Sequence, residues 1–331
     1  MKDNNSPYAT REPEMSVVIC TPDSYETIRK TTRCLREQTV KHKLEIVIVV
    51  PSKKKLGLID SEVEDFCQTR IVEADISSSL AAARVAGISQ ASAPVVVFAE
   101  DHSFPEPGWA EALIQAHKGP WAAVGPVICN ANPNSITSWA QLFMTYGRWT
   151  EPVKAGQIDD LPGHNSSYKR AILLDYGPEL ENKLVRETLL HWDLQARGYS
   201  LYLEPAARTH HVNISRLSSI MRDSYHGARL FAATRASEGK WSFLKRLVYT
   251  FSEPLFALRR FREIMKNIDR TGHNKELVPL VIPVISLGLL ALGLGEMMGY
   301  ALGVANSEQI ANSFEFHRHR FLLKRDQKLV T

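Results

Sequence analysis

The chain has 331 residues, of which 44% are hydrophobic and 23% charged, a composition that excludes a disordered or a disulfide-stapled protein. This length accommodates one large domain and an appendage. The net charge of +4 is unevenly placed, because residues 216–275 carry thirteen Lys or Arg and only five Asp or Glu, a local charge of +8. Such a basic segment favours an anionic partner surface, either lipid headgroups or nucleic acid.

The cysteines and the N-terminus indicate a reducing compartment. Cys20, Cys34, Cys67 and Cys129 form no CxxC pair, so they are expected to behave as small apolar residues. Residues 1–14 are polar and contain no apolar stretch of the kind found in a signal peptide. We therefore expect a flexible N-terminus and a folded body that stays in the cytosol.

Short runs of β-branched residues alternate with helical patterns in the first part of the chain. Strands are expected at residues 16–20 (SVVIC), near 70–72, and at 44–50 (LEIVIVV) and 94–99 (PVVVFA), with an alanine-rich helix at about 79–91. Continuous apolar strands alternating with helices indicate an α/β fold with a mostly parallel sheet covered on both faces. In such sheets, ligands bind beyond the carboxyl ends of the strands.

The next part of the chain continues this alternation. We expect a helix from Trp109 to about His117, a strand over residues 121–129, a helix over 179–197 and a strand over 199–204. Gly198 follows the second of these helices, at the position where a left-handed cap ends a helix. Glu100, Asp101 and His102 directly follow the strand at 94–99, where such side chains are poorly placed for packing and well placed for chemistry.

Five blocks of the sequence, in order and spacing, resemble glycosyltransferase family 2 with its GT-A fold, the nucleotide-diphospho-sugar transferase fold. They cover about 200 of the 331 residues and are SVVICT (16–21), SLAAARVAGI (79–88), VVVFAEDHSFPEPGW (95–109), GHNSSYKR (163–170) and RGYSLYLEPAARTHH (197–211). The resemblance implies inverting transfer of a sugar from a nucleotide-sugar donor to a glycan, lipid-linked or protein acceptor. For a membrane-associated bacterial member, it implies cell-surface polysaccharide or glycoconjugate assembly.

The resemblance also implies a divalent cation, Mn²⁺ or Mg²⁺, held by Asp101, His102 and His211. Such a cation neutralises the diphosphate of the donor and orients it. The Asp-x-Asp type motif of the family reads Glu100-Asp101-His102 here, and imidazole suits Mn²⁺ better than Mg²⁺. The alternative interpretation is a solvated loop with an ordinary surface histidine.

The donor side is expected to use residues at the ends of several strands. The base of the donor stays open, because Val50 lies where family members often carry an Asp that holds the base or ribose, and Asp23 or Asp75 are the substitutes. The residues expected to bind the donor are Thr21, Asp23, Arg84, Glu100 and Asp101.

Inverting transfer needs a carboxylate that removes the proton of the acceptor hydroxyl. The family pattern, counted back from the end of the helix at 179–197, matches Glu187 to this base. Arg186 replaces the first acid of the usual pair, and Asp193 is the reserve candidate. His164 and Asn165 are expected on the acceptor side.

The later part of the chain points to a membrane. The basic segment 216–275 contains several aromatic residues, as helices at a headgroup surface do, and residues 277–295 contain no charge. We expect a GT-A domain over 15–215, a hydrophobic membrane segment over 276–303 and a basic tail over 304–331. A tilted span, a re-entrant hairpin and a buried core helix pair are all open. The expected partner is a membrane surface, at the cytoplasmic face of a bacterial inner membrane, and not nucleic acid.

Two other functions compete with the enzyme. One is a catalytically silent GT-A domain that binds a nucleotide-sugar or a partner protein, which the changes at Val50 and Arg186 motivate. The other is a nucleotidyltransferase, which would need a glycine-rich phosphate loop after the first strand, whereas residues 21–24 (TPDS) contain no glycine. Farther on, the spacing of Gly295, Gly299 and Gly303 predicts a close helix contact in lipid.

Overall fold

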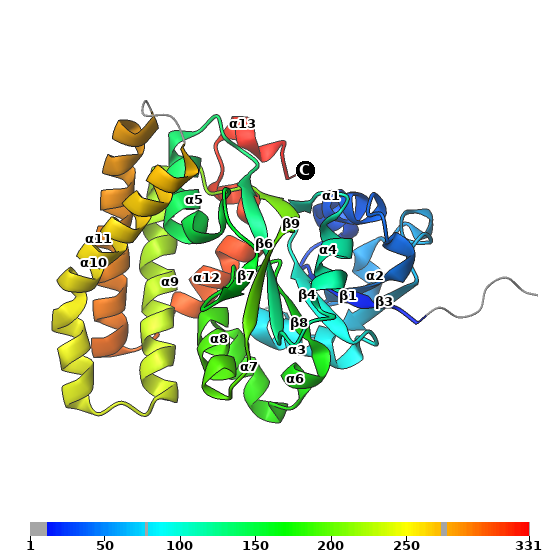
Figure 1. The fold of residues 1–331 in the computed structure, drawn as a ribbon, viewed down its shortest axis with the longest axis horizontal. Coiled ribbons are helices and arrows are strands. Elements are labelled where there is room, and N and C mark those ends of the chain that lie inside the picture. The colour runs from blue at the N-terminus through cyan, green and yellow to red at the C-terminus, as the bar shows by residue number, and fades with distance from the viewer. Residues whose placement is uncertain (1–11, 77–78, 273–276, 331) are drawn as a thin grey trace, which may run out of the picture.

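The structure is a computed structural model that describes residues 12–76, 79–272 and 277–330. Most of the expected N-terminal segment, and the boundary expected between residues 275 and 276, lie outside the described residues. Figure 1 shows a sheet flanked by helices, with a layer of long helices standing against one side of this body.

The centre of the fold is a mixed nine-stranded sheet with the order β3-β2-β1-β4-β8-β6-β9-β5, and β7 pairs with β9. The pairs along β3-β2-β1-β4 and the pair β6–β9 are parallel, and the pairs that involve β5, β7 and β8 are antiparallel. The expected α/β fold is confirmed, and its parallel part is shorter than expected because β8 runs in the opposite direction between β4 and β6. The strands are β1 (Met15–Cys20), β2 (Leu44–Val50), β3 (Gln68–Glu73), β4 (Val95–Ala99), β5 (Ser103–Pro105), β6 (Ala123–Asn130), β7 (Gly156–Ile158), β8 (Ser167–Lys169) and β9 (Leu201–His211).

Helices cover both faces of the sheet, so successive residues of a strand are buried on alternate faces. In β2, Ile46 and Ile48 belong to one core cluster and Val47 and Val49 to the other, which is the alternation of a strand packed on two sides. The first cluster packs against α1 (Tyr25–Arg36) and α4 (Trp109–Ala116), and the second against α3 (Leu80–Gln90), α7 (Leu180–Leu184) and α8 (Glu187–Ala196). The helices α2 (Lys53–Leu56), α5 (Ile136–Tyr146) and α6 (Arg170–Leu174) complete the body.

Two local differences from the expected elements matter for the site. The helix expected over 179–197 is broken, because Arg186 has an extended backbone (φ −145°, ψ 107°) and Glu187 becomes the first residue of α8. The last strand is longer than expected and pairs with β5, so that Ser103 lies opposite His211. This pairing brings the end of β9 beside the residues that follow β4.

Three long helices, α9 (Leu217–Glu238), α10 (Phe243–Thr271) and α11 (Leu277–Leu302), form the layer beside the body (Figure 1). A Cβ on Gly295 would lie 2.2 Å from the backbone oxygen of Tyr225, and one on Gly299 would lie 2.5 Å from the backbone oxygen of Arg229. The small-residue contact expected from the sequence is therefore formed within the chain, between α11 and α9.

The residues after α11 return to the body. The helix α12 (Ser307–Phe316) packs against α9, and a 3-10 turn (Arg318–Phe321) and α13 (Lys324–Gln327) follow. Leu322 and Val330 are buried with Phe104 and Val212 of the body. The segment expected as a basic tail is thus part of the globular core.

Replacing Gly295 by Ala should lower the free energy of unfolding by about 1–3 kcal/mol, because the helices would have to separate to admit the new methyl group. Alanine is favoured over glycine in a helix by up to about 1 kcal/mol, so without this contact the change would stabilise the protein. Gly108→Ala is the control, since a Cβ there meets nothing within 4 Å. Urea unfolding measures both, and a Gly295→Ala variant as stable as the wild type would contradict the close packing.

Candidate active site

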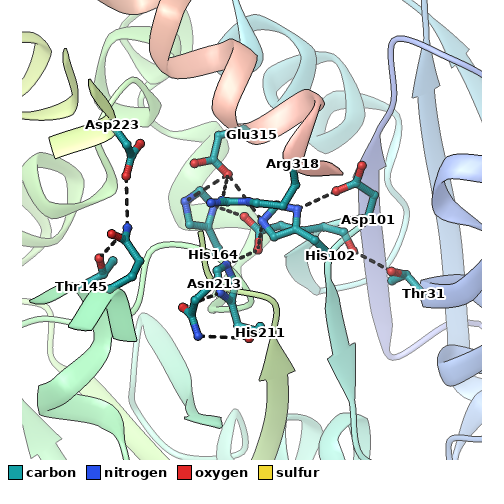
Figure 2. Close-up of polar contacts among 12 residues, drawn as sticks. Thr31, Asp101, His102, Thr145, His164, His211, Asn213, Asp223, Glu315 and Arg318 are labelled. Atoms are coloured by element: carbon teal, nitrogen blue, oxygen red, sulfur yellow. Dashed lines mark hydrogen bonds and ion pairs between the residues drawn. The ribbon is translucent and has the colours of Figure 1, made fainter. Parts of the chain in front are cut away.

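The ends of β4 and β9 bring three buried side chains together (Figure 2). Glu100 Oε2 lies 3.5 Å from His102 Nε2 and 3.7 Å from His211 Nε2. Glu100 and His102 come directly after β4, whereas His211 is the last residue of β9. The pairing of β5 with β9 creates this cluster from residues more than 100 positions apart in the sequence.

The other nitrogen of each imidazole is held by a neighbouring side chain. His102 Nδ1 lies 2.6 Å from Asp101 Oδ1, and His211 Nδ1 lies 3.1 Å from Asn213 Oδ1. If each Nδ1 donates a proton to its oxygen partner, each Nε2 presents a lone pair toward Glu100. Partners of this kind orient histidines that bind metals.

The cluster has the properties of a metal site. Glu100 Oε2 and His102 Nε2 are buried and have no hydrogen-bond partner among the described residues, which is costly unless a ligand contacts them, whereas Glu100 Oε1 lies 2.7 Å from His164 Nδ1. Burial alone would raise the pKa of Glu100, but the His164 and His102 imidazoles hold it well below its usual range. Burial, followed by the nearby His102, holds the pKa of His211 well below its usual range. An ionised carboxylate and a neutral imidazole are the forms that bind a cation, and Glu100, His102 and His211 could hold one.

Asp101 occupies a different position from the one expected. It was predicted as a direct ligand, but its carboxylate faces Nδ1 of His102, and the acid grouped with the two histidines is Glu100. Glu100 was predicted on the donor side, next to the cation. The direct role of Asp101 stays a prediction, and the geometry favours a role in orienting His102.

A second group of charged side chains lies beside this cluster. Arg84, on α3, forms a buried ion pair with Glu187, and its Nη2 lies 2.9 Å from His164 Nδ1. Its guanidinium also lies over the ring of Phe98, 4.9 Å from the ring centre. Arg84 was expected to bind the donor, whereas its guanidinium here holds Glu187 in place.

Glu187 is buried at the first position of α8. Burial alone would raise its pKa, but Arg84 and His164 lower it to about 2, so the carboxylate is ionised at neutral pH. A Cβ on Gly163 would lie 2.8 Å from Cδ of Glu187, so only glycine leaves room for this side chain. The predicted base is therefore preformed and charged.

The two residues expected on the acceptor side have different surroundings. His164 Nδ1 lies 2.7 Å from Glu100 Oε1, so this imidazole links the cluster of Glu100 and the two histidines to Arg84 and Glu187. Burial would lower the pKa of His164, but the surrounding carboxylates, Glu100 foremost, raise it to about 9. Asn165 has a left-handed backbone (φ 63°), and its N–H donates to the carbonyl of Phe98 (2.9 Å). Asn165 thus shapes the loop that presents His164.

The remaining candidates lie farther out. Asp193 accepts hydrogen bonds from Tyr176 (2.7 Å) and Arg197 (2.6 Å) and pairs with Lys183 (3.2 Å), which are contacts of a structural residue. Thr21 follows β1, and its hydroxyl bonds to that of Thr27 near the start of α1 (2.8 Å). Asp23 and Asp75 are both exposed, after β1 and β3 respectively.

Two of the cavities that adjoin these groups lie next to the candidate metal cluster. One of about 340 Å³ is lined by Glu187, His164, His211 and Arg186 together with the aromatic residues Tyr146, Trp149 and Phe231. The other, of about 20 Å³, lies at the ends of β1 and β4 and is lined by side chains that include Cys20, Glu100, His102 and Phe316. The large cavity lies on the Glu187 side of the cluster and the small one on the side expected for the donor.

Residues 16–177 match the family model for glycosyl transferase family 2. This part of the chain belongs to that family. The match includes four of the five blocks that carry the resemblance and ends before Glu187 and His211. This match bears out the family resemblance that the sequence predicted for this part of the chain, and the activity of the whole chain and the roles of the individual residues stay predictions.

Among solved structures, the chain is similar to a crystal structure of GalNAc-T7 with UDP, GalNAc and Mn²⁺. The two are 14% identical with a TM-score of 0.45, and the match covers 63% of this chain and 44% of the other. The match therefore spans less than half of that protein's chain. No curated protein sequence matches this chain.

The candidate site also contains two residues that sequence reasoning missed. Glu315 and Arg318, from α12 and the turn after it, lie over the histidines (Figure 2). Glu315 Oε2 lies 3.9 Å from His102 Nε2 and 3.9 Å from His164 Nε2. The signal in the sequence was the run FEFHRHRF (314–321), where charged residues alternate with aromatic ones that need burial.

Substitution at Glu100 should weaken Mn²⁺ binding more than substitution at Asp101. Glu100→Gln removes a charged ligand, whereas Asp101→Asn only disturbs the orientation of His102, a change that typically costs about 10–100-fold in metal affinity. Calorimetric titration with Mn²⁺ measures both, and Asp193→Asn is the control that should bind as the wild type does. Full binding by Glu100→Gln with none by Asp101→Asn would restore Asp101 as the direct ligand.

Proposed function

We propose that this glycosyltransferase inverts the anomeric centre of the transferred sugar, with Glu187 as the base and a divalent cation held by Glu100, His102 and His211. The observation that carries the proposal is the buried, ionised Glu187 on the wall of the 340 Å³ cavity. Its carboxylate lies 3.9 Å from His164 Nδ1, which in turn lies 2.7 Å from Glu100, so the base and the cation site adjoin.

The chemistry needs one base and a stabilised leaving group. The acceptor hydroxyl oxygen attacks the anomeric carbon, the bond from that carbon to the phosphate oxygen breaks, and its electron pair leaves with the nucleoside diphosphate. The proton of the hydroxyl passes to the carboxylate of Glu187. The cation, when bound, neutralises the charge on the departing diphosphate. Arg84 fixes the carboxylate so that it reaches the acceptor in one orientation.

The large cavity suits a sugar-bearing acceptor. Its aromatic walls offer faces on which a sugar ring packs, and its charged groups offer hydrogen bonds to hydroxyls. We propose a glycan, lipid-linked or protein acceptor in cell-surface polysaccharide or glycoconjugate assembly.

Glu187→Gln should lower kcat by roughly 10² or more and leave donor binding little changed, because the amide keeps the shape but accepts no proton. Release of nucleoside diphosphate from a panel of nucleotide-sugars with Mn²⁺ and a glycan acceptor measures the rate. Asp193→Asn is the matched control and should keep the wild-type rate. An unimpaired Glu187→Gln variant would remove Glu187 from the mechanism, and a wild type that consumes no nucleotide-sugar would overturn the proposed function.

We also propose that the enzyme works at the cytoplasmic face of a membrane, held there by α10 and α11. Within the described residues, α11 is the one helix long and apolar enough to cross a bilayer, and about a third of its most apolar window is buried in the protein. Its neighbour α10 adds apolar side chains and exposed cations that complement anionic lipid. The large exposed apolar side chains are Phe243, Leu244, Val248, Phe251, Leu255 and Leu258 on α10 and Leu280, Leu287, Leu290, Leu294 and Leu302 on α11.

The inner faces of these helices favour docking on the surface over a span. Arg260 on α10 pairs with Glu253 (2.6 Å) and with Glu296 of α11 (2.7 Å), so the acidic group that ends the apolar stretch is neutralised inside the protein. Gly295 holds α11 against α9, which joins it to the body. A helix fixed on one side to the body and apolar on the other fits the plane of the membrane surface.

The double variant Phe251→Ser/Leu255→Ser should bind vesicles of phosphatidylcholine and phosphatidylglycerol at least about 10-fold more weakly, since burying each side chain contributes about 1.5–3 kcal/mol. Both side chains are more than 70% exposed, so the fold should not change. Leu174→Ser, on α6 of the body, is the control. Point variants are preferred to truncation after α9 because α12 and α13 pack into the body. A wild type that does not sediment with vesicles would refute the docking surface.

A further inference from the structure

Residues 314–321 cross the active site as a strap that is fastened at both ends. Phe314 is buried with Ile214 and Ile220 and stacks on Phe321, with ring centres 3.9 Å apart. On the other side, the N–H of Leu323 donates to the hydroxyl of Ser215 (2.8 Å). These contacts hold the side chains of the strap over Glu100, His102 and His211.

Arg318 is the buried cation of this strap. It is 4% exposed, and its Nε has no hydrogen-bond partner among the described residues. Its Nη2 lies 3.4 Å from Glu315 Oε2, a long contact for an ion pair, and its charge also faces Glu100 and Asp223. A guanidinium is always charged and is costly to bury with unmatched donors, and its planar fork suits phosphate oxygens.

The carboxylate of Glu315 lies where the proposed mechanism requires the negatively charged diphosphate of the donor to bind. Its carboxylate lies between Arg318, His102 and His164, with Oε2 3.9 Å from an imidazole nitrogen of each histidine (Figure 2). The donor's diphosphate has to contact a cation bound at Glu100, His102 and His211, so it has to come to the same place. The carboxylate and the diphosphate would therefore compete for one set of positive groups.

The strap also fills the donor side of the site. The cavity there has about 20 Å³ and is lined by Glu315 and Phe316. Pockets that bind small molecules have about 300–1,000 Å³. A donor that enters on this side therefore needs the side chains of the strap to move, while Arg318 and Glu315 also line the neighbouring cavity of about 340 Å³.

We propose that Arg318 binds the diphosphate of the donor and that Glu315 is the resting counter-ion that the diphosphate displaces. This inference rests on the proposed function. Displacement exchanges the long contact to Glu315 for charge-assisted hydrogen bonds to phosphate, and it places a second positive charge beside the leaving group. The C-terminal segment thereby supplies a binding residue that lies outside residues 16–177, the range matched to the family.

Calorimetric titration with inorganic pyrophosphate in the presence of Mn²⁺ tests this pair, because the probe contains no base or sugar. Arg318→Gln should weaken binding by about 10–100-fold, the range for hydrogen bonds to charged groups. Glu315→Gln should strengthen binding several-fold, because the competing charge is gone. Opposite changes in pyrophosphate affinity in the two variants separate this role from a structural one, since damage to the strap would weaken binding in both. Melting temperatures close to that of the wild type confirm that each variant is folded.

Arg320→Gln is the matched control, because it removes the same charge from an exposed position of the same strap. Loss of binding in Arg320→Gln equal to that in Arg318→Gln would overturn the inference, as would weaker binding by Glu315→Gln or wild-type binding by Arg318→Gln. Pyrophosphate binding that the wild type shows and Glu100→Gln lacks would support the proposed cation site independently. A wild type that binds no pyrophosphate would overturn the proposed function and this inference together.

Discussion

The site depends on one buried carboxylate. Glu100 lies at the end of a central strand, and its two oxygens face His102, His164 and His211 instead of hydrogen-bond donors of the backbone. An acid kept ionised in such a place is stable only with positive charge around it, which the His164 and His102 imidazoles supply and a bound divalent cation would increase. The orientation of the histidines, the buried asparagine behind His211 and the placement of the strap all follow from satisfying this charge.

The carboxylate of Glu100 is also connected, through other side chains, to the proposed base Glu187. Glu100 contacts His164, His164 contacts Arg84, and Arg84 pairs with Glu187, so the candidate cation site and the proposed base are joined through direct contacts. Because each member fixes the next, a change in one should alter the position of the others. Preorganisation of this kind lowers the cost of aligning donor and acceptor.

The C-terminal helices serve the site in two ways. The helices α10 and α11 present an apolar face outward, while α12 returns the chain to the metal cluster with Glu315 and Arg318. The surface that we propose for lipid and the strap over the donor side are therefore parts of one continuous segment. This arrangement also explains why the basic, apolar end of the chain is built into the body by Leu322 and Val330.

The sequence by itself determined the strands of the parallel part, the helices at 79–91 and 109–117 to within a residue or two, the family, and Glu100, His102, Glu187 and His211 as residues of the site. Each of these follows from local pattern or from motif spacing, which the linear chain carries. The break at Arg186 and the grouping of Glu100, instead of Asp101, with the two histidines required the tertiary structure. Arg84 as the partner of Glu187, and the roles of Glu315 and Arg318, also depend on it. These contacts join residues 100 or more positions apart, and long-range packing, with its need to neutralise buried charge, selects them rather than any local preference.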